Sequence, residues 1–187
     1  PITEMKVQEE FVETFDDDNS EDIDMSDSIT KVLQHPTVSS KSFLITIGDR
    51  TVSGMVARDQ FVGPYQVPVS DYSLSLRSYT SNNGEVLSIG EKPTIALINP
   101  AASMRMALGE ALTNMSGVVI EELNNVQVSA NWMAASGENS DDFALRSGVE
   151  ALSKIAVDLK VSIPVGKDSL SMRTKWSENN SDYEVSS

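Results

Sequence analysis

The chain has 187 residues and a formal net charge of −14, so it is long enough for one domain with a sizeable core, while its acidity argues against binding a nucleic-acid backbone. The absence of cysteine excludes disulfides, thiol nucleophiles and thiolate metal sites. No stretch has the length and apolarity of a membrane span or a signal peptide, so we expect a cytoplasmic protein with no membrane partner.

The composition divides the chain into three parts. Residues 1–28 include the acidic run "DDDNSEDIDMSD" and few apolar residues, which predicts a flexible linker. Residues 29–176 carry the regular patterns of a folded domain, and residues 177–187 are predicted to be an unstructured tail or a truncated loop. We expect the chain to be an excerpt of a longer protein.

The first half is predicted to be rich in strands. A short helix at 28–33 ends before Pro36, and His35 beside it is read as structural. The run "SFLITI" at 42–47 is typical of a strand, and further β segments follow in "TVSGMVA" (51–57) and "YQVPVSDYSLSL" (65–76). A hairpin or a partly open β layer is the expected result.

The second half alternates strands and helices. "PTIALI" at 93–98 is predicted to be a strand that leads into a helix with Asn99 as N-cap, Pro100 at the first position and Gly117 just beyond the end. A strand at 126–133, a helix opened by Ser140 and a strand at 161–165 follow. The order predicts an α+β fold of α/β-like character, with a mixed β layer and helices packed on one face.

The segment "VSIPVGKDSLSM" raises the question of a phosphate-binding loop. A P-loop needs a glycine where this chain has Val161, and Ser or Thr where it has Asp168, so that motif is excluded. Two interpretations remain open: a strand that delivers Gly166, Lys167 and Asp168 to a cleft at its C-terminal end, or an ordinary surface turn.

The helix after Asn99 carries a candidate metal pair. Glu110 and Asn114 are four residues apart and therefore project from one helix face, where their oxygens suit magnesium. Asp71 would be a third ligand if the β layer lies across this helix. The alternative is a solvated polar face.

Several longer stretches of the sequence resemble a known family. "FLITIGDRTVSGMVARDQFVGPYQVPVSDYS", "GEALTN", "VSANWMAASGE" and "IPVGKDSLSMRTKW" closely resemble phosphoribosylformylglycinamidine synthase of the large, single-chain type, over residues 29–176. The resemblance implies the N-terminal half of the second of two aminoimidazole-ribonucleotide-synthetase-like (PurM-like) units, incomplete at its C-terminus. It implies as partners the companion half, the first unit and the glutaminase domain.

The family converts formylglycinamide ribonucleotide and glutamine to formylglycinamidine ribonucleotide with ATP. Its Cys/His/Glu glutaminase triad cannot lie in a chain without cysteine, so the resemblance implies no catalytic residue here and an inactive excerpt. It does imply an auxiliary ADP site with Mg²⁺, held by Asp71, Glu110 and Asn114, with Ser70 beside the nucleotide and Lys41 near the phosphates. It also implies that Gly166, Lys167 and Asp168 form a loop lining a cleft between domain halves. Arg58, Asp59 and Gln60 belong to the resemblance without an assigned task.

Two other functions stay open. One is a non-catalytic packing module, in which the excerpt forms a homodimer through an uncovered sheet edge. The other is a stand-alone small-molecule kinase related to aminoimidazole ribonucleotide synthetase.

Overall fold

The computed structural model describes residues 24–48, 54–137 and 139–186. The chain divides into two compact units, of which one ends at Ser88 and the other begins at Ile89, so the predicted 29–176 domain spans both. Most of the predicted linker, 1–23, lies outside the described residues. Its last residues are not linker, because Met25 already begins a helix.

The unit of this chain that ends at Ser88 is called its first unit below, and the one that begins at Ile89 its second. The first described element of the first unit is helix α1 (Met25–Gln34), which confirms the predicted helix and extends it. The Asp24 carboxylate accepts a hydrogen bond from the Ser26 backbone N–H at 2.9 Å and so caps the first turn. The helix ends at Gln34 because the residue before Pro36 is sterically disfavoured in the helical conformation.

The predicted strand at 42–47 is wrong, because these residues form the short helix α2 (Ser42–Ile47). Aromatic and β-branched residues favour a strand when they pack on a neighbouring strand. No strand of the described chain pairs with this segment, and Phe43, Leu44 and Ile47 are exposed. Local bonds prevail instead, with the Thr46 hydroxyl donating to the Ser42 carbonyl at 3.0 Å.

The predicted β layer of the first unit is a three-stranded antiparallel meander. Its strands β1 (Val56–Arg58), β2 (Tyr72–Leu76) and β3 (Gly84–Ser88) pair in chain order. The two predicted β segments are therefore confirmed only near their ends, and residues 51–53 of the first lie outside the described ranges. Before β2, Val69 makes an isolated bridge with Phe61. Gly63 and Gln66 adopt positive φ angles between these two residues.

In the second unit, the predicted strand at 93–98 is wrong, because Pro93–Ala96 form helix α3. Proline fixes a helical φ and needs no donor in the first turn, so Pro93 favours the start of a helix. The Asn99 N–H then donates to the Ile95 carbonyl at 2.8 Å, which continues the turn.

The remaining elements of the second unit follow the predicted order. They are α4 (Pro100–Asn114), β4 (Gln127–Met133), α5 (Asn139–Leu159) and β5 (Ser162–Ser169), with 3-10 turns at Met115–Gly117 and Leu123–Asn125. The Asn99 side chain accepts from the Ala102 N–H at 2.8 Å, which confirms the predicted cap of α4.

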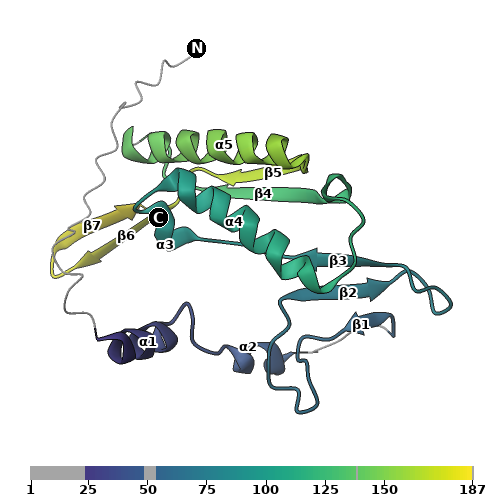
Figure 1. Ribbon diagram of the computed structural model, residues 1–187. Coiled ribbons are helices and arrows are strands. Elements are labelled where there is room, and N and C mark those ends of the chain that lie inside the picture. Colours follow the sequence, from purple (N-terminus) through teal and green to yellow (C-terminus); the bar gives the residue numbers. More distant parts are fainter. Residues whose placement is uncertain (1–23, 49–53, 138, 187) are drawn as a thin grey trace. The chain divides into compact units, whose positions relative to one another are not determined.

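The core of this unit lies between α4, α5 and one face of the sheet. Strands β4 and β5 are parallel neighbours joined through α5 (Figure 1). Side chains at alternate positions of a strand share a face, and Val128, Ala130 and Trp132 of β4 pack together against Leu108 of α4 and Leu152 of α5. Both helices thus cover one face, as predicted. They approach closely at Gly148, where an added Cβ would lie 3.0 Å from the Met104 side chain.

Strand β5 is longer than the predicted 161–165. It gains one residue relative to β4 between the Gln127↔Ser162 and Ser129↔Val165 pairs, which is a bulge that includes Pro164. Proline cannot donate a ladder hydrogen bond, so a bulge is a position that tolerates it. Beyond the bulge the pairing resumes and runs to Ser169.

The predicted tail at 177–187 is also wrong. Strands β6 (Arg173–Glu178) and β7 (Ser181–Ser186) form an antiparallel hairpin. Asn179 and Asn180 both have positive φ, 51° and 61°, which matches the two-residue turn that best follows strand twist. Trp176 and Tyr183 stand directly opposite and stack with ring centroids 5.2 Å apart. The Asn-Asn pair was the sequence signal for this hairpin.

Candidate functional site

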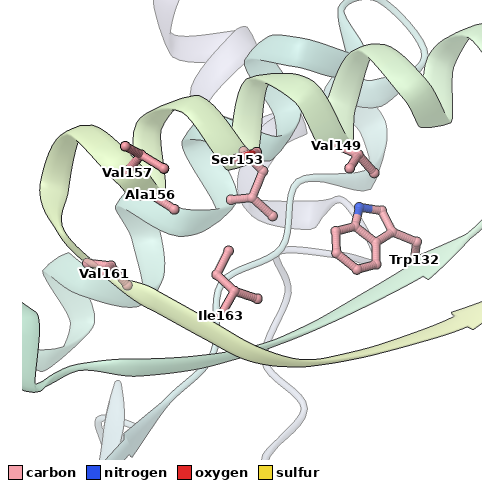
Figure 2. Close-up of a pocket in the computed structure, with 8 residues that line it drawn as sticks. Trp132, Val149, Ser153, Ala156, Val157, Val161 and Ile163 are labelled. Carbon is pink, nitrogen blue, oxygen red and sulfur yellow. The ribbon is translucent and has the colours of Figure 1, made fainter.

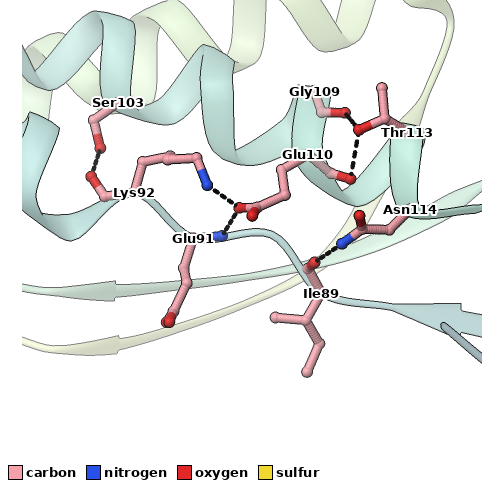
Figure 3. A network of polar contacts seen from close by, with 8 residues as sticks. All are labelled: Ile89, Glu91, Lys92, Ser103, Gly109, Glu110, Thr113 and Asn114. Atoms are coloured by element: carbon pink, nitrogen blue, oxygen red, sulfur yellow. Dashed lines mark hydrogen bonds and ion pairs between the residues drawn. The ribbon is translucent and has the colours of Figure 1, made fainter. Parts of the chain in front are cut away.

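Glu110 and Asn114 lie one turn apart on α4 and both reach the same neighbouring backbone, residues 89–92 (Figure 3). The Glu91 N–H donates to Glu110 Oε2 at 2.9 Å, and the Asn114 side-chain amide donates to the Ile89 carbonyl at 3.0 Å. The prediction that the two side chains share a face is therefore confirmed. Here that face holds the 89–92 segment rather than open solvent.

Gly90 explains how closely this segment approaches the helix. A Cβ built at Gly90 would lie 2.0 Å from the Ala107 carbonyl oxygen and 2.6 Å from the Ala111 nitrogen. Such distances leave no space for any other residue, because both neighbours are helix backbone. The segment is fixed further at Lys92, whose carbonyl accepts from the buried Ser103 hydroxyl at 2.7 Å.

The Glu110 carboxylate already has a cationic partner. Lys92 Nζ lies 2.5 Å from Glu110 Oε2, and both side chains are about one-third exposed. The hydrogen bond from Lys92, followed by that from the Glu91 N–H, lowers the pKa of Glu110 below its usual value, although partial burial opposes the shift. Sequence reasoning missed Lys92 and Ser103 because the contact depends on the path of the chain around Gly90.

The donor chemistry of Glu110 and Asn114 fits a hard divalent cation. Both known donors use Glu110 Oε2, and the Asn114 amide nitrogen faces Ile89, so Glu110 Oε1 and Asn114 Oδ1 are the oxygens available for a ligand. Among the residues that the structure describes, no group of three or more His, Cys, Asp or Glu side chains is arranged to hold a metal. Further ligands are therefore needed.

Ser70 and Asp71 precede β2, in the unit that ends at Ser88, whereas Glu110 and Asn114 belong to the other unit. The Ser70 hydroxyl accepts from Arg58 Nε at 2.8 Å and donates to the Tyr72 carbonyl at 2.6 Å. Arg58 also stacks over the Tyr72 ring, 4.5 Å from its centroid. Asp71 is exposed, and within the described ranges it has no hydrogen-bond or ion-pair partner.

Asp59 and Gln60, which follow Arg58 in the same motif, make hydrogen bonds to nearby backbone. Asp59 accepts a hydrogen bond from the Gln60 N–H at 2.8 Å, and the Gln60 backbone carbonyl accepts from the Ser70 N–H at 2.7 Å. The motif therefore supports the backbone that carries Ser70 and Asp71. This gives Arg58 and Gln60 a positioning role that sequence reasoning left unassigned.

Lys41 serves the turn between α1 and α2. Its ammonium donates to the carbonyl oxygens of Thr37 and Ser39 at 3.0 and 2.9 Å. A phosphate would have to replace these local acceptors.

Gly166, Lys167 and Asp168 do not form a loop. They lie within β5 and pair with Ala130, Asn131 and Trp132 of β4, so the predicted loop is corrected to a strand. An added Cβ at Gly166 would lie 3.2 Å from the Trp132 ring, so this glycine makes room for the indole. Lys167 Nζ contacts the Ser169 hydroxyl at 2.5 Å, on the sheet face opposite Trp132.

An apolar pocket of about 310 Å³ lies between α5 and strands β4 and β5 (Figure 2). The Trp132 indole N–H in its wall is buried and has no hydrogen-bond partner among the residues that the structure describes. The lining residues are Trp132, Val149, Leu152, Ser153, Ala156, Val157, Val161 and Ile163. A pocket with no charged side chain does not suit a nucleotide phosphate, so it is distinct from the Glu110 site.

No helix in the described part of the chain is long and apolar enough to cross a membrane.

Membership of a family follows from comparison with known proteins. A family model described as the FGAR-AT PurM_N-like domain matches residues 40–187, a span that includes Lys41, Ser70, Asp71, Glu110 and Asn114. This match ties the chain to enzymes of purine biosynthesis, and the mixed helix and sheet fold agrees with it. The chain therefore belongs to the FGAR-AT PurM_N-like domain family.

Proposed function

We propose that this chain is a segment of phosphoribosylformylglycinamidine synthase of the large, single-chain type, acting in the cytoplasm. That enzyme is an ATP-dependent ligase that uses glutamine to convert formylglycinamide ribonucleotide to formylglycinamidine ribonucleotide. The family match over residues 40–187 supports this assignment. Since the chain has no cysteine, the glutaminase triad belongs to another domain, and we expect the segment alone to be inactive.

Within that enzyme, the segment contributes an auxiliary Mg-ADP site. The observation that carries this proposal is that Glu110 and Asn114 meet on one face of α4 with one oxygen of each available. Exposed Asp71 supplies a third oxygen ligand. Magnesium bound there would neutralise phosphate charge next to an acidic chain. The remaining ligand comes from the companion half of the unit.

Ser70 and Lys41 contact the nucleotide in this proposal. Each must exchange a bond that it makes in the free chain. The Ser70 hydroxyl is held between Arg58 and the Tyr72 carbonyl, and the Lys41 ammonium is held by two carbonyl oxygens. An ammonium prefers a phosphate oxygen to a neutral carbonyl, because a hydrogen bond between two charged groups is stronger.

Calorimetric titration with Mg·ADP tests the site. Glu110→Gln keeps an acceptor for the Glu91 N–H but removes the charge that a cation needs, so we expect the affinity for Mg·ADP to fall by about tenfold or more. We expect a loss of the same size for Asp71→Asn. Glu150→Gln is the matched control, because Glu150 is an exposed helical carboxylate paired with Arg146 on α5. Equal binding by the parent and Glu110→Gln, or no binding by the parent, contradicts the proposed site.

A further inference from the structure

The contact between Lys92 and Glu110 is built more firmly than an ordinary surface ion pair. The Ser103 hydroxyl, in a side chain only 3% exposed, holds the Lys92 carbonyl at 2.7 Å. Gly90 packs against the α4 backbone two residues earlier, and Pro93 restricts the chain directly after Lys92. The backbone on both sides is therefore fixed, and the Lys92 side chain is directed onto Glu110 (Figure 3).

Lys92 occupies the carboxylate in the manner of a bound cation. Its Nζ lies 2.5 Å from Glu110 Oε2, the same oxygen that accepts from the Glu91 N–H at 2.9 Å. A magnesium ion coordinates carboxylate oxygens at about 2.0–2.1 Å. An ammonium and a divalent cation bound to the same carboxylate would lie within a few ångströms of each other. At that separation the repulsion between the two positive charges is strong.

We propose that Lys92 is an internal competitor for the metal site, so that a divalent cation binds Glu110 Oε1 only when the Lys92 ammonium leaves Oε2 of the same carboxylate. The inference rests on the proposed function, because it concerns the same carboxylate. In the free chain Lys92 neutralises Glu110 and holds residues 89–92 on α4. After the exchange, the ammonium is released towards solvent while the backbone of the segment stays anchored through Ser103, Gly90 and Asn114.

Removing the competitor should strengthen binding of the metal alone. We expect Lys92→Met to raise the affinity for Mg²⁺, measured by calorimetry without nucleotide, by about tenfold, because one positive charge beside the ion is lost. Lys92→Arg keeps the charge and should not strengthen binding. Lys154→Met is the matched control, since it removes one positive charge at an exposed position of α5. Equal affinity of Lys92→Met and the parent, or a gain matched by Lys154→Met, overturns the inference.

The parent chain gives an independent readout that needs no variant. We expect Mg²⁺ to increase the rate at which Lys92 is reductively methylated, measured by mass spectrometry with Lys154 as the internal reference. An unchanged rate at saturating Mg²⁺ overturns the exchange. Circular dichroism verifies that Lys92→Met is folded, and if it is not, the methylation result alone decides.

The outcomes also separate this inference from the proposed site. If Glu110→Gln abolishes Mg²⁺ binding while Lys92→Met matches the parent, the site stands and the competition is wrong. If Glu110→Gln binds Mg²⁺ as the parent does, Glu110 is no ligand and both proposals fail. If neither the parent nor Lys92→Met binds Mg²⁺, no cation replaces Lys92, and the inference fails with the site.

Discussion

Gly90 is a position at which the structure has no space for a side chain. Its position places a would-be Cβ 2.0 Å from the Ala107 carbonyl oxygen, and helix backbone cannot yield without breaking its hydrogen bonds. We expect Gly90→Ala to reduce the free energy of unfolding by about 2–3 kcal/mol, as overpacking does, and to loosen the segment that presents Lys92 to Glu110. Urea denaturation measures the loss.

Gly109 is the control for that substitution. It lies in the interior of α4, and nothing is within 4 Å of an added Cβ. Gly109→Ala should therefore stabilise the chain by about 0.5–1 kcal/mol through helix propensity alone. If Gly90→Ala stabilises the chain by a similar amount, the close approach of residues 89–92 to α4 is wrong.

At the scale of elements, the β6–β7 hairpin carries a charge cluster across its strands. Lys175 Nζ and Arg173 Nη1 lie 2.9 and 3.4 Å from the carboxylate oxygens of Glu184. The hydrogen bond from Lys175 is the main cause that lowers the pKa of Glu184, and partial desolvation opposes it. Because the pKa is lowered in the folded state, this stabilisation is complete above the unfolded pKa and is lost as the pH falls through the folded one.

Lys175→Met should move the pKa of Glu184 back towards the usual range for glutamate. NMR titration of the side-chain carboxyl carbon measures this directly. Lys154→Met, on α5, removes the same charge without touching the hairpin and should leave the Glu184 titration unchanged. An identical Glu184 titration in Lys175→Met and the parent would show that the ion pair does not persist in solution.

At the scale of the whole molecule, the unit that begins at Ile89 has a hydrophobic core of its own. Its buried centre is Leu108, Ala130 and Leu152, and every partly buried residue packed on it comes from α4, β4, α5 or β5. We expect a fragment of residues 89–187 to unfold cooperatively by itself, as followed by circular dichroism on heating. Leu108, 4% exposed, offers the internal check, because Leu108→Ala should cost about 2–5 kcal/mol.

A fragment without a cooperative transition would contradict this division of the chain. It would mean that residues before Ile89 complete the core.

The candidate site shows how far sequence reasoning reached. The spacing of Glu110 and Asn114 predicted a shared helix face, and that geometry is local to one turn of α4. Lys92 is eighteen residues from Glu110 in sequence, and their contact exists only because Gly90 lets the chain run against α4. No local pattern encodes such a long-range contact.

By itself, the sequence determined the elements whose signals are local. Asn99 and Pro100 set the start of α4, and apolar periodicity set α5. Alternating apolar residues set β4, and a β-branched run set the first part of β5. Only the tertiary structure decided between strand and helix at 42–47, because a strand forms where a neighbour accepts its hydrogen bonds. It likewise extended β5 through Gly166, Lys167 and Asp168, where pairing with β4 replaces the expected loop.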